Sequence, residues 1–159
     1  MKKIMLMVVA VFMFIGCGTR TYEENENLKS LFNSMKEGVI VINENEEIIF
    51  YNKMAIKLLK ISMKNPIGAT VRDIFNNELI YNIIESTIKN ESMENHFEIM
   101  QHGNPPAYIS CNIEPLVNSG KVVGNILLFE DITNEKNNKN KLRQAENMQA
   151  LNSISARSE

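Results

Sequence analysis

The side chains best suited to chemistry are two cysteines, two histidines and a few carboxylates, and their spacing favours no catalytic site. Cys17 and Cys111 lie far apart, which favours neither a disulfide framework nor a paired metal site. The glycines are scattered and form no phosphate-binding loop, and neither an HExxH motif nor a set of nucleophile, base and orienting acid is present. Asp73, Glu78 and Glu85 stand at helix starts or on helix faces, where carboxylates usually cap or face solvent. We therefore expect no enzyme activity, metal or cofactor in this chain.

The elements that position these residues begin with a short amphipathic helix followed by two strands. The helix is indicated by apolar residues at three- and four-residue steps, namely Leu28, Leu31, Phe32 and Met35. Gly38 ends it, because glycine tolerates the left-handed backbone found just past a helix C-terminus. Residues 39–42 and 48–51 are β-branched and aromatic, and the polar turn between them predicts antiparallel neighbours.

The rest of the chain up to residue 133 predicts two helices and three further strands. Residues 53–60 indicate a short helix, and residues 78–90 form a helix with one broad apolar face. Residues 96–100 and 107–114 alternate apolar and polar side chains, and residues 122–129 are almost continuously apolar. The sequence therefore predicts an α+β fold with a five-stranded antiparallel sheet and helices on one face.

Two segments of this pattern resemble the PAS domain, a small sensor module of bacterial signalling proteins. The first runs Glu37-Gly38-Val39-Ile40-Val41-Ile42-Asn43, turn, Ile48-Ile49-Phe50-Tyr51-Asn52, helix. The second, Gly124-Asn125-Ile126-Leu127-Leu128-Phe129-Glu130-Asp131-Ile132-Thr133, looks like the last strand of that family and its Asp-Ile-Thr exit motif. The resemblance covers residues 28–133 and implies the PAS fold.

The resemblance also implies a ligand pocket walled by the helix over residues 78–90. Two alternatives stay open: a small organic ligand in this pocket, or a packed core without a ligand. The candidate lining residues are Phe50, Ile56, Leu59, Ile83 and Ile84.

This sequence lacks the residues with which other PAS domains hold haem or form a flavin adduct. Haem-binding members carry an axial histidine on the long helix, and this helix has none here. The two histidines lie elsewhere: His96 falls on the sheet face opposite Phe97 and Ile99, and His102 lies in a turn. Flavin-adduct members use a cysteine in an Asn-Cys-Arg setting, whereas Cys111 lies on the apolar side of a strand, where a buried, inert thiol is usual. We expect neither cofactor.

Length and charge limit the remaining classes. A chain of 159 residues with 44% hydrophobic residues suits one domain with appendages. Its formal net charge is −2 and its charges are mixed, so no clustered basic surface indicates nucleic-acid binding.

The N-terminus predicts a membrane link through residues 1–20. Lys2 and Lys3 precede an apolar run that is short for a transmembrane helix and typical of a signal peptide. Phe14-Ile15-Gly16-Cys17 resembles a bacterial lipobox, with Phe14 in place of the usual leucine, which would make Cys17 a lipid attachment site. A retained short anchor is the alternative. Residues 21–27 read as an acidic, solvated linker.

Residues 134–159 predict a polar helix that carries a weak apolar stripe suited to pairing with another helix. Its second half resembles the run just upstream of the phosphoacceptor box in sensor histidine kinases. No histidine follows His102, and nothing resembles an ATP-binding domain, so we expect no autophosphorylation by this polypeptide.

The leading hypothesis is the sensory and dimerisation part of a membrane-linked two-component sensor histidine kinase, truncated before its kinase core. Asp131 and Thr133 are its candidate relay residues, although Asp131 as a plain helix cap is an equal alternative. A homodimer or a pair with a kinase is the expected partner state. One alternative is a lipid-anchored binding protein outside the cytoplasmic membrane, because Lys2 and Lys3 favour a cytoplasmic N-terminus and one membrane span would then place the domain outside. The other alternative is a heterodimer partner of intact kinases.

Overall fold

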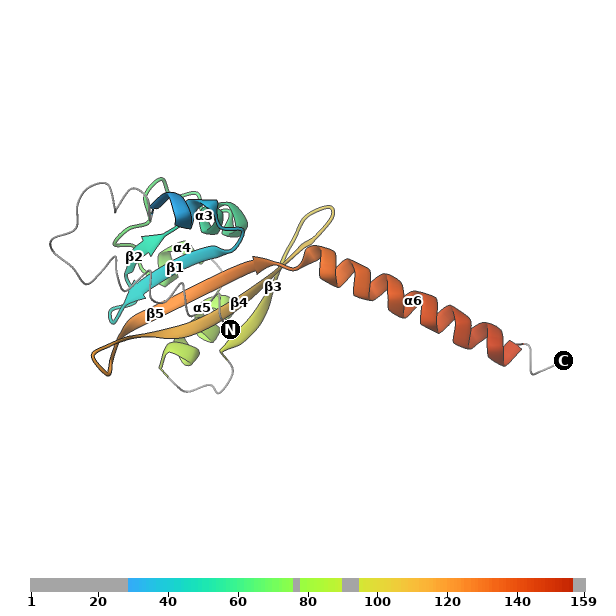
Figure 1. The fold of residues 1–159 in the computed structure, drawn as a ribbon. Helices are drawn as coiled ribbons and strands as arrows, with labels where there is room; N and C mark the ends of the chain where they lie inside the picture. Colours follow the sequence, from blue (N-terminus) through green and yellow to red (C-terminus); the bar gives the residue numbers. More distant parts are fainter. Residues whose placement is uncertain (1–28, 76–77, 90–94, 156–159) are drawn as a thin grey trace.

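The computed structural model describes residues 29–75, 78–89 and 95–155, which form an α+β fold around one five-stranded antiparallel sheet (Figure 1). The spatial strand order is β2-β1-β5-β4-β3. The strands are β1 (Gly38–Asn43), β2 (Ile48–Tyr51), β3 (His96–Gln101), β4 (Ala107–Asn118) and β5 (Lys121–Asp131). The helices are α3 (Lys53–Leu59), α4 (Val71–Ile74), α5 (Glu78–Ile88) and α6 (Thr133–Ser155), and residues 29–34 are also helical. The predicted fold class is confirmed.

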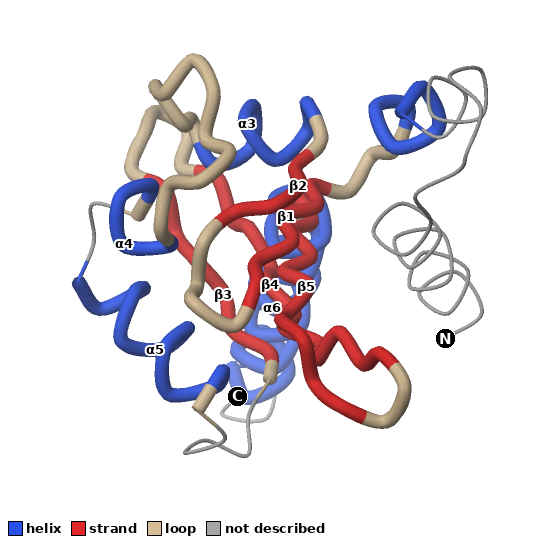
Figure 2. The backbone as a smooth tube through the Cα atoms, turned by 90° about the vertical axis from the view of Figure 1, so that its left-hand side faces the viewer, coloured by secondary structure: helices blue, strands red, loops and turns tan. Residues whose placement is uncertain are grey.

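Two apolar layers bury the inner strand β1 on both faces. Ile40 and Ile42 belong to the larger core, which packs against α3, α4 and α5. Val39 and Val41 belong to a smaller core on the other face, together with Phe32 from the helix over residues 29–34. Figure 2 shows α3, α4 and α5 on one side of the sheet and this first helix on the other. Most helices therefore cover one face, as predicted, and the first helix seals the opposite face at β1.

A bulge in β2 shifts the alternation of side chains between the two faces. Ile42 pairs with Ile48 and Val41 pairs with Phe50, so Ile49 is the extra residue without a partner on β1. Because a bulge adds one residue, Ile48 and Phe50 face opposite sides of the sheet instead of the same side. The Phe50 ring packs against Phe32, with ring centroids 4.8 Å apart.

Asn52 joins the first helix, β1 and α3 through one buried amide. Its side-chain oxygen accepts hydrogen bonds from the N–H groups of Val39 and Ala55, each at 2.9 Å. Its NH₂ group donates to the carbonyl oxygens of Phe32 and Glu37, at 3.0 and 2.9 Å. The residue is 1% exposed, and all these polar groups are therefore satisfied away from water.

Gly124 lets β5 lie against β1 at unusually close range. Its φ of 154° lies in a region that side chains rarely adopt, and a Cβ there would meet the Ile42 carbonyl oxygen at 2.0 Å. Only glycine fits this position without a shift of the backbone.

Helix α6 leaves the end of β5 and projects away from the sheet (Figure 1). From residue 137 to residue 152 every side chain on it is exposed, including Leu142, Met148 and Leu151. Among the described residues, no helix is both long and apolar enough to cross a membrane. The predicted signal or anchor over residues 1–20, with Cys17, lies outside the described residues, as does the linker over residues 21–27.

Candidate ligand groove and helix junction

A groove of about 430 Å³ lies on the helix side of the sheet, and we call it the α3–β3 groove. It lies between the end of α3, the helix α4, the start of α5 and the edge strand β3. Its lining combines eight apolar and five polar side chains. The residues that line it are Leu59, Lys60, Ile61, Ser62, Met63, Asp73, Ile74, Phe75, Ile80, Ile99, Met100, Gln101 and His102.

Two local features shape the end of α3 at this groove. Lys60 ends the helix with a left-handed backbone (φ 54°), and its N–H donates to the Ile56 carbonyl oxygen. The Gln101 side chain on β3 donates from Nε2 to the Leu58 carbonyl oxygen at 2.7 Å. The edge strand is thereby fastened to α3 across the groove.

Helix α4 presents a carboxylate at the rim. Thr70 and Asp73 form a capping box in which the Thr70 N–H donates to Asp73 Oδ2 at 2.8 Å. Hydrogen bonds from the Thr70 backbone and hydroxyl hold the pKa of Asp73 below its usual range. The carboxylate therefore stays ionised at neutral pH.

The floor of the groove belongs to the larger core. Phe75 is 8% exposed and packs on Phe129 with ring centroids 6.1 Å apart, and Ile99 is 7% exposed. Buried apolar residues beside several polar groups suit a small organic molecule that has both apolar and polar parts. Within the described ranges, no group of three or more His, Cys, Asp or Glu residues is placed to hold a metal ion.

The structure does not gather the five predicted lining residues around one cavity. Leu59 lines the α3–β3 groove, and Ile84 is fully buried in the core beneath it. Ile56 and Ile83 are half-buried. Phe50 lies on the other face of the sheet because of the β2 bulge.

Cys111 and His96 lie where the alternation predicted. Cys111 is fully buried in the larger core, and this burial raises the pKa of its thiol. His96 is exposed on the opposite sheet face, with Nδ1 3.0 Å from Asn112 Oδ1. His102 is exposed at the rim of the groove.

A second site of interest is the junction where β5 passes into α6, which contains both predicted relay residues. Asp131 Oδ1 accepts a hydrogen bond at 2.9 Å from the N–H of Thr133, the first residue of α6. The Thr133 hydroxyl accepts from the Tyr108 N–H at 2.9 Å, and the Ile132 N–H donates to the Tyr108 carbonyl oxygen at 2.9 Å. Asp131 therefore satisfies one N–H group at the start of α6, and Thr133 fastens the helix to β4.

An ion pair adds a link from α6 to β3. Lys136 Nζ, in the first turns of α6, pairs with Glu98 Oε2. The same strand contributes Ile99, Met100 and Gln101 to the α3–β3 groove. One strand thus contacts both the groove and the exit helix.

Sequence reasoning missed Glu98, Gln101, Tyr108 and Lys136, because each acts through a partner at least 25 residues away along the chain. Charge alternation on β3 marks Glu98 as a surface residue, but only the packing of α6 against the β3–β4 pair supplies its partner.

A family model described as "PAS domain" matches residues 36–134, which is more than half of the chain. The match spans every strand, and it also spans the junction of β5 with α6.

A curated relative is the cyclic di-GMP phosphodiesterase PdeB of Shewanella oneidensis. The two sequences are 24% identical over 141 residues, which cover 85% of this chain. The chain spans only 16% of the length of that relative.

Solved structures share the fold at low sequence identity. The histidine kinase ThkA, in a complex with the response regulator TrrA, has a TM-score of 0.60 and 22% identity over 80% of this chain and 38% of that one. An RNA-binding Light-Oxygen-Voltage receptor has a TM-score of 0.57 and 14% identity over 82% and 40%. A PAS domain from Colwellia psychrerythraea has a TM-score of 0.52 and 18% identity over 70% and 98%.

Proposed function

The chain belongs to the PAS domain family of sensory modules, and on this premise we propose that it senses a small organic ligand in the α3–β3 groove and signals through α6. A module of this kind is not catalytic by itself. The observation that carries the proposal is the double role of β3, which lines the groove and pairs with α6 through Glu98 and Lys136. If β3 can take two placements, a ligand that binds one of them more tightly would shift the strand toward it, and the start of α6 would move with the strand.

We further propose that α6 leads to the kinase core of a membrane-linked two-component sensor histidine kinase. Two observations support this output: α6 follows the Asp131-Ile132-Thr133 exit directly, and ThkA shares the fold over 80% of the chain. In this arrangement Asp131 and Thr133 couple the sheet to α6, and α6 pairs with a second copy or with a kinase.

A cyclic di-GMP phosphodiesterase output is the second candidate, because PdeB matches 85% of the chain. Fusion of residues 1–159 to each type of output domain separates the two. The correct output is the one whose activity changes when the groove is altered by Ile99→Asn.

The coupling is tested by charge reversal at the Glu98–Lys136 pair in the histidine kinase fusion. Glu98→Lys and Lys136→Glu should each change autophosphorylation, because each places like charges side by side, and the double reversal should restore it. Asn138→Lys, at an exposed α6 position, is the matched control for added charge. Single variants that fold normally and signal as the parent does would refute the coupling.

Membrane linkage rests on residues 1–20 and is tested separately. We propose that Cys17 or the apolar run holds the protein at the membrane. Metabolic lipid labelling of the chain and of Cys17→Ser, followed by membrane fractionation, distinguishes the two. Label that depends on Cys17 favours the lipid-anchored binding protein, and membrane retention without label favours the plain anchor.

A further inference from the structure

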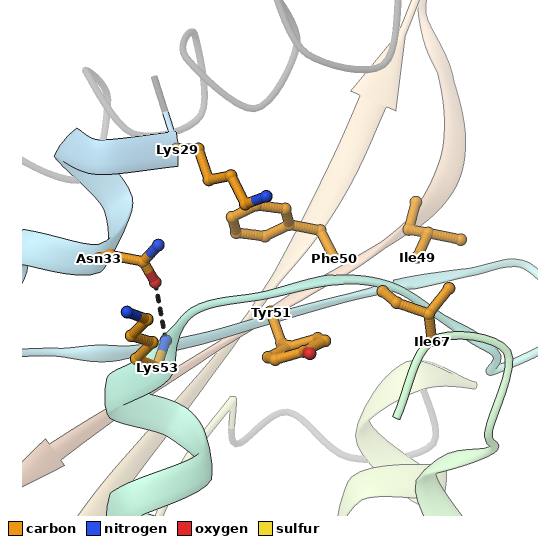
Figure 3. A pocket seen from close by; sticks show the side chains of 7 residues that line it. All are labelled: Lys29, Asn33, Ile49, Phe50, Tyr51, Lys53 and Ile67. Atoms are coloured by element: carbon orange, nitrogen blue, oxygen red, sulfur yellow. Dashed lines mark hydrogen bonds between the residues drawn. The ribbon is translucent and has the colours of Figure 1, made fainter. Parts of the chain in front are cut away.

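A second groove, of about 370 Å³, lies at the opposite edge of the sheet, beside β2; we call it the β2 groove. Its lining comes from the first helix, from β2, from the start of α3 and from the loop before α4 (Figure 3). It shares no residue with the α3–β3 groove.

One side of the β2 groove is cationic. Lys29 and Lys53 are exposed, and neither forms an ion pair with another described residue. Asn33 lies beside them (Figure 3), and its Oδ1 accepts a hydrogen bond from the Lys53 backbone N–H at 3.1 Å. That bond occupies the amide oxygen and leaves the NH₂ group as the donor. This side therefore offers two positive charges and an amide donor.

The other side is apolar and exposed to solvent. Ile49 and Ile67 are 37% and 49% exposed. Figure 3 shows these two side chains together, on the side of the groove away from Lys29 and Lys53. Ile49 is the bulged residue of β2, and bulges often redirect a side chain at a sheet edge. Phe50 and Tyr51 also line the groove, on opposite sides of the β2 ribbon (Figure 3).

We propose that the β2 groove binds a small organic anion with a flat apolar body, such as an aromatic carboxylate. The anionic group would lie between Lys29, Asn33 and Lys53, and the apolar body would cover Ile49 and Ile67. The separation of charge from apolar surface argues for this amphipathic class over a plain inorganic anion, which would leave both isoleucines in water. The volume lies at the lower end of small-molecule sites and suits one or two rings.

The test uses 1-naphthoate and its neutral isostere 1-naphthamide, titrated into the full chain and followed by ligand-detected NMR. Naphthoate should bind more tightly than naphthamide. The variant Lys29→Gln/Lys53→Gln should weaken naphthoate about ten-fold, since each exposed charge pair contributes modestly, and should leave naphthamide almost unchanged. Ile49→Ser should weaken both probes.

Lys57→Gln, at an exposed lysine of α3 outside the groove, is the matched control and should leave binding unchanged. Equal losses in Lys57→Gln and in the double variant would show general charge attraction and overturn the site. Equal affinities for naphthoate and naphthamide, or no binding of naphthoate, would also overturn it. Loss of naphthoate binding in the variant Ile61→Asn, which alters the α3–β3 groove, would assign the ligand to that groove instead.

Discussion

At the scale of single residues, Asn52 is the polar group on which the packing of the N-terminal half depends. Its amide satisfies backbone groups of the first helix, β1 and α3 within a site closed to water. A buried group that loses its partner costs more than a typical hydrogen bond contributes, because its desolvation is no longer offset.

We therefore expect Asn52→Ala to lower the free energy of unfolding by about 3 kcal/mol. Urea denaturation followed by circular dichroism measures this change. Asn82→Ala, at an exposed position of α5, should stay within about 0.5 kcal/mol of the parent. Equal effects of the two substitutions would contradict the assignment.

Asp131 gives α6 a dependence on pH. Hydrogen bonds from the Thr133 side chain and backbone lower the pKa of Asp131 in the folded protein. Its contribution to stability is therefore complete above the unfolded pKa of about 3.9 and is lost as the pH falls through the lower folded value. The residue is exposed, so the contribution is modest.

In an NMR titration, the Thr133 amide resonance should move only below about pH 4, with a midpoint under the usual aspartate value. Asp131→Asn should abolish this movement. A midpoint at or above the usual value would show that the hydrogen bond between Asp131 and the Thr133 N–H is not formed in solution.

At the scale of elements, the local patterns predict the strands and the helices well. Branched runs predict β1 and β2, and the long polar helix after Thr133 follows from its composition. A period-two pattern does not reveal the bulge at Ile49. Without the bulge, Phe50 would share a sheet face with Ile48 and the pocket side that contains Ile84; with it, Phe50 lies on the other face.

Long-range partners were also not predictable from sequence. The pairing of Glu98 with Lys136 depends on where α6 starts in space, and the position of Thr133 against Tyr108 depends on the register of β4 with β5. Burial, by contrast, follows from the alternation of neighbours in sequence, and so the burial of Cys111 could be predicted.

The contact between β5 and β1 yields a prediction at this scale. Gly124→Ala should destabilise the fold by more than about 3 kcal/mol, or prevent folding, because its Cβ would overlap the Ile42 carbonyl oxygen. Gly120→Ala, in the open β4–β5 turn with φ 78°, should cost only about 1 kcal/mol. Thermal melts compare the two, and similar losses would show that β1 can move to accept the methyl group.

At the scale of the whole molecule, α6 carries apolar side chains that no other described element covers. Leu142, Met148 and Leu151 are 61%, 65% and 66% exposed. Pairing with a second α6 would remove this surface from water.

We expect Leu142→Ser/Leu151→Ser to shift the full chain, held in mild detergent, from dimer to monomer in sedimentation velocity. Gln144→Ser, at an exposed polar position of the same helix, should leave the dimer intact. A parent chain that is already monomeric at high concentration would rule out pairing through α6.

The chain joins and leaves the sheet at the same end of two adjacent strands, since Gly38 at the start of β1 pairs with Phe129 near the end of β5. The strands are antiparallel, so a pulling force applied at these two points would open the β1–β5 ladder one pair at a time instead of shearing all pairs together. The module should consequently have low mechanical strength along its own chain. In a protein that holds it between a fixed point and a moving one, it would yield early under tension.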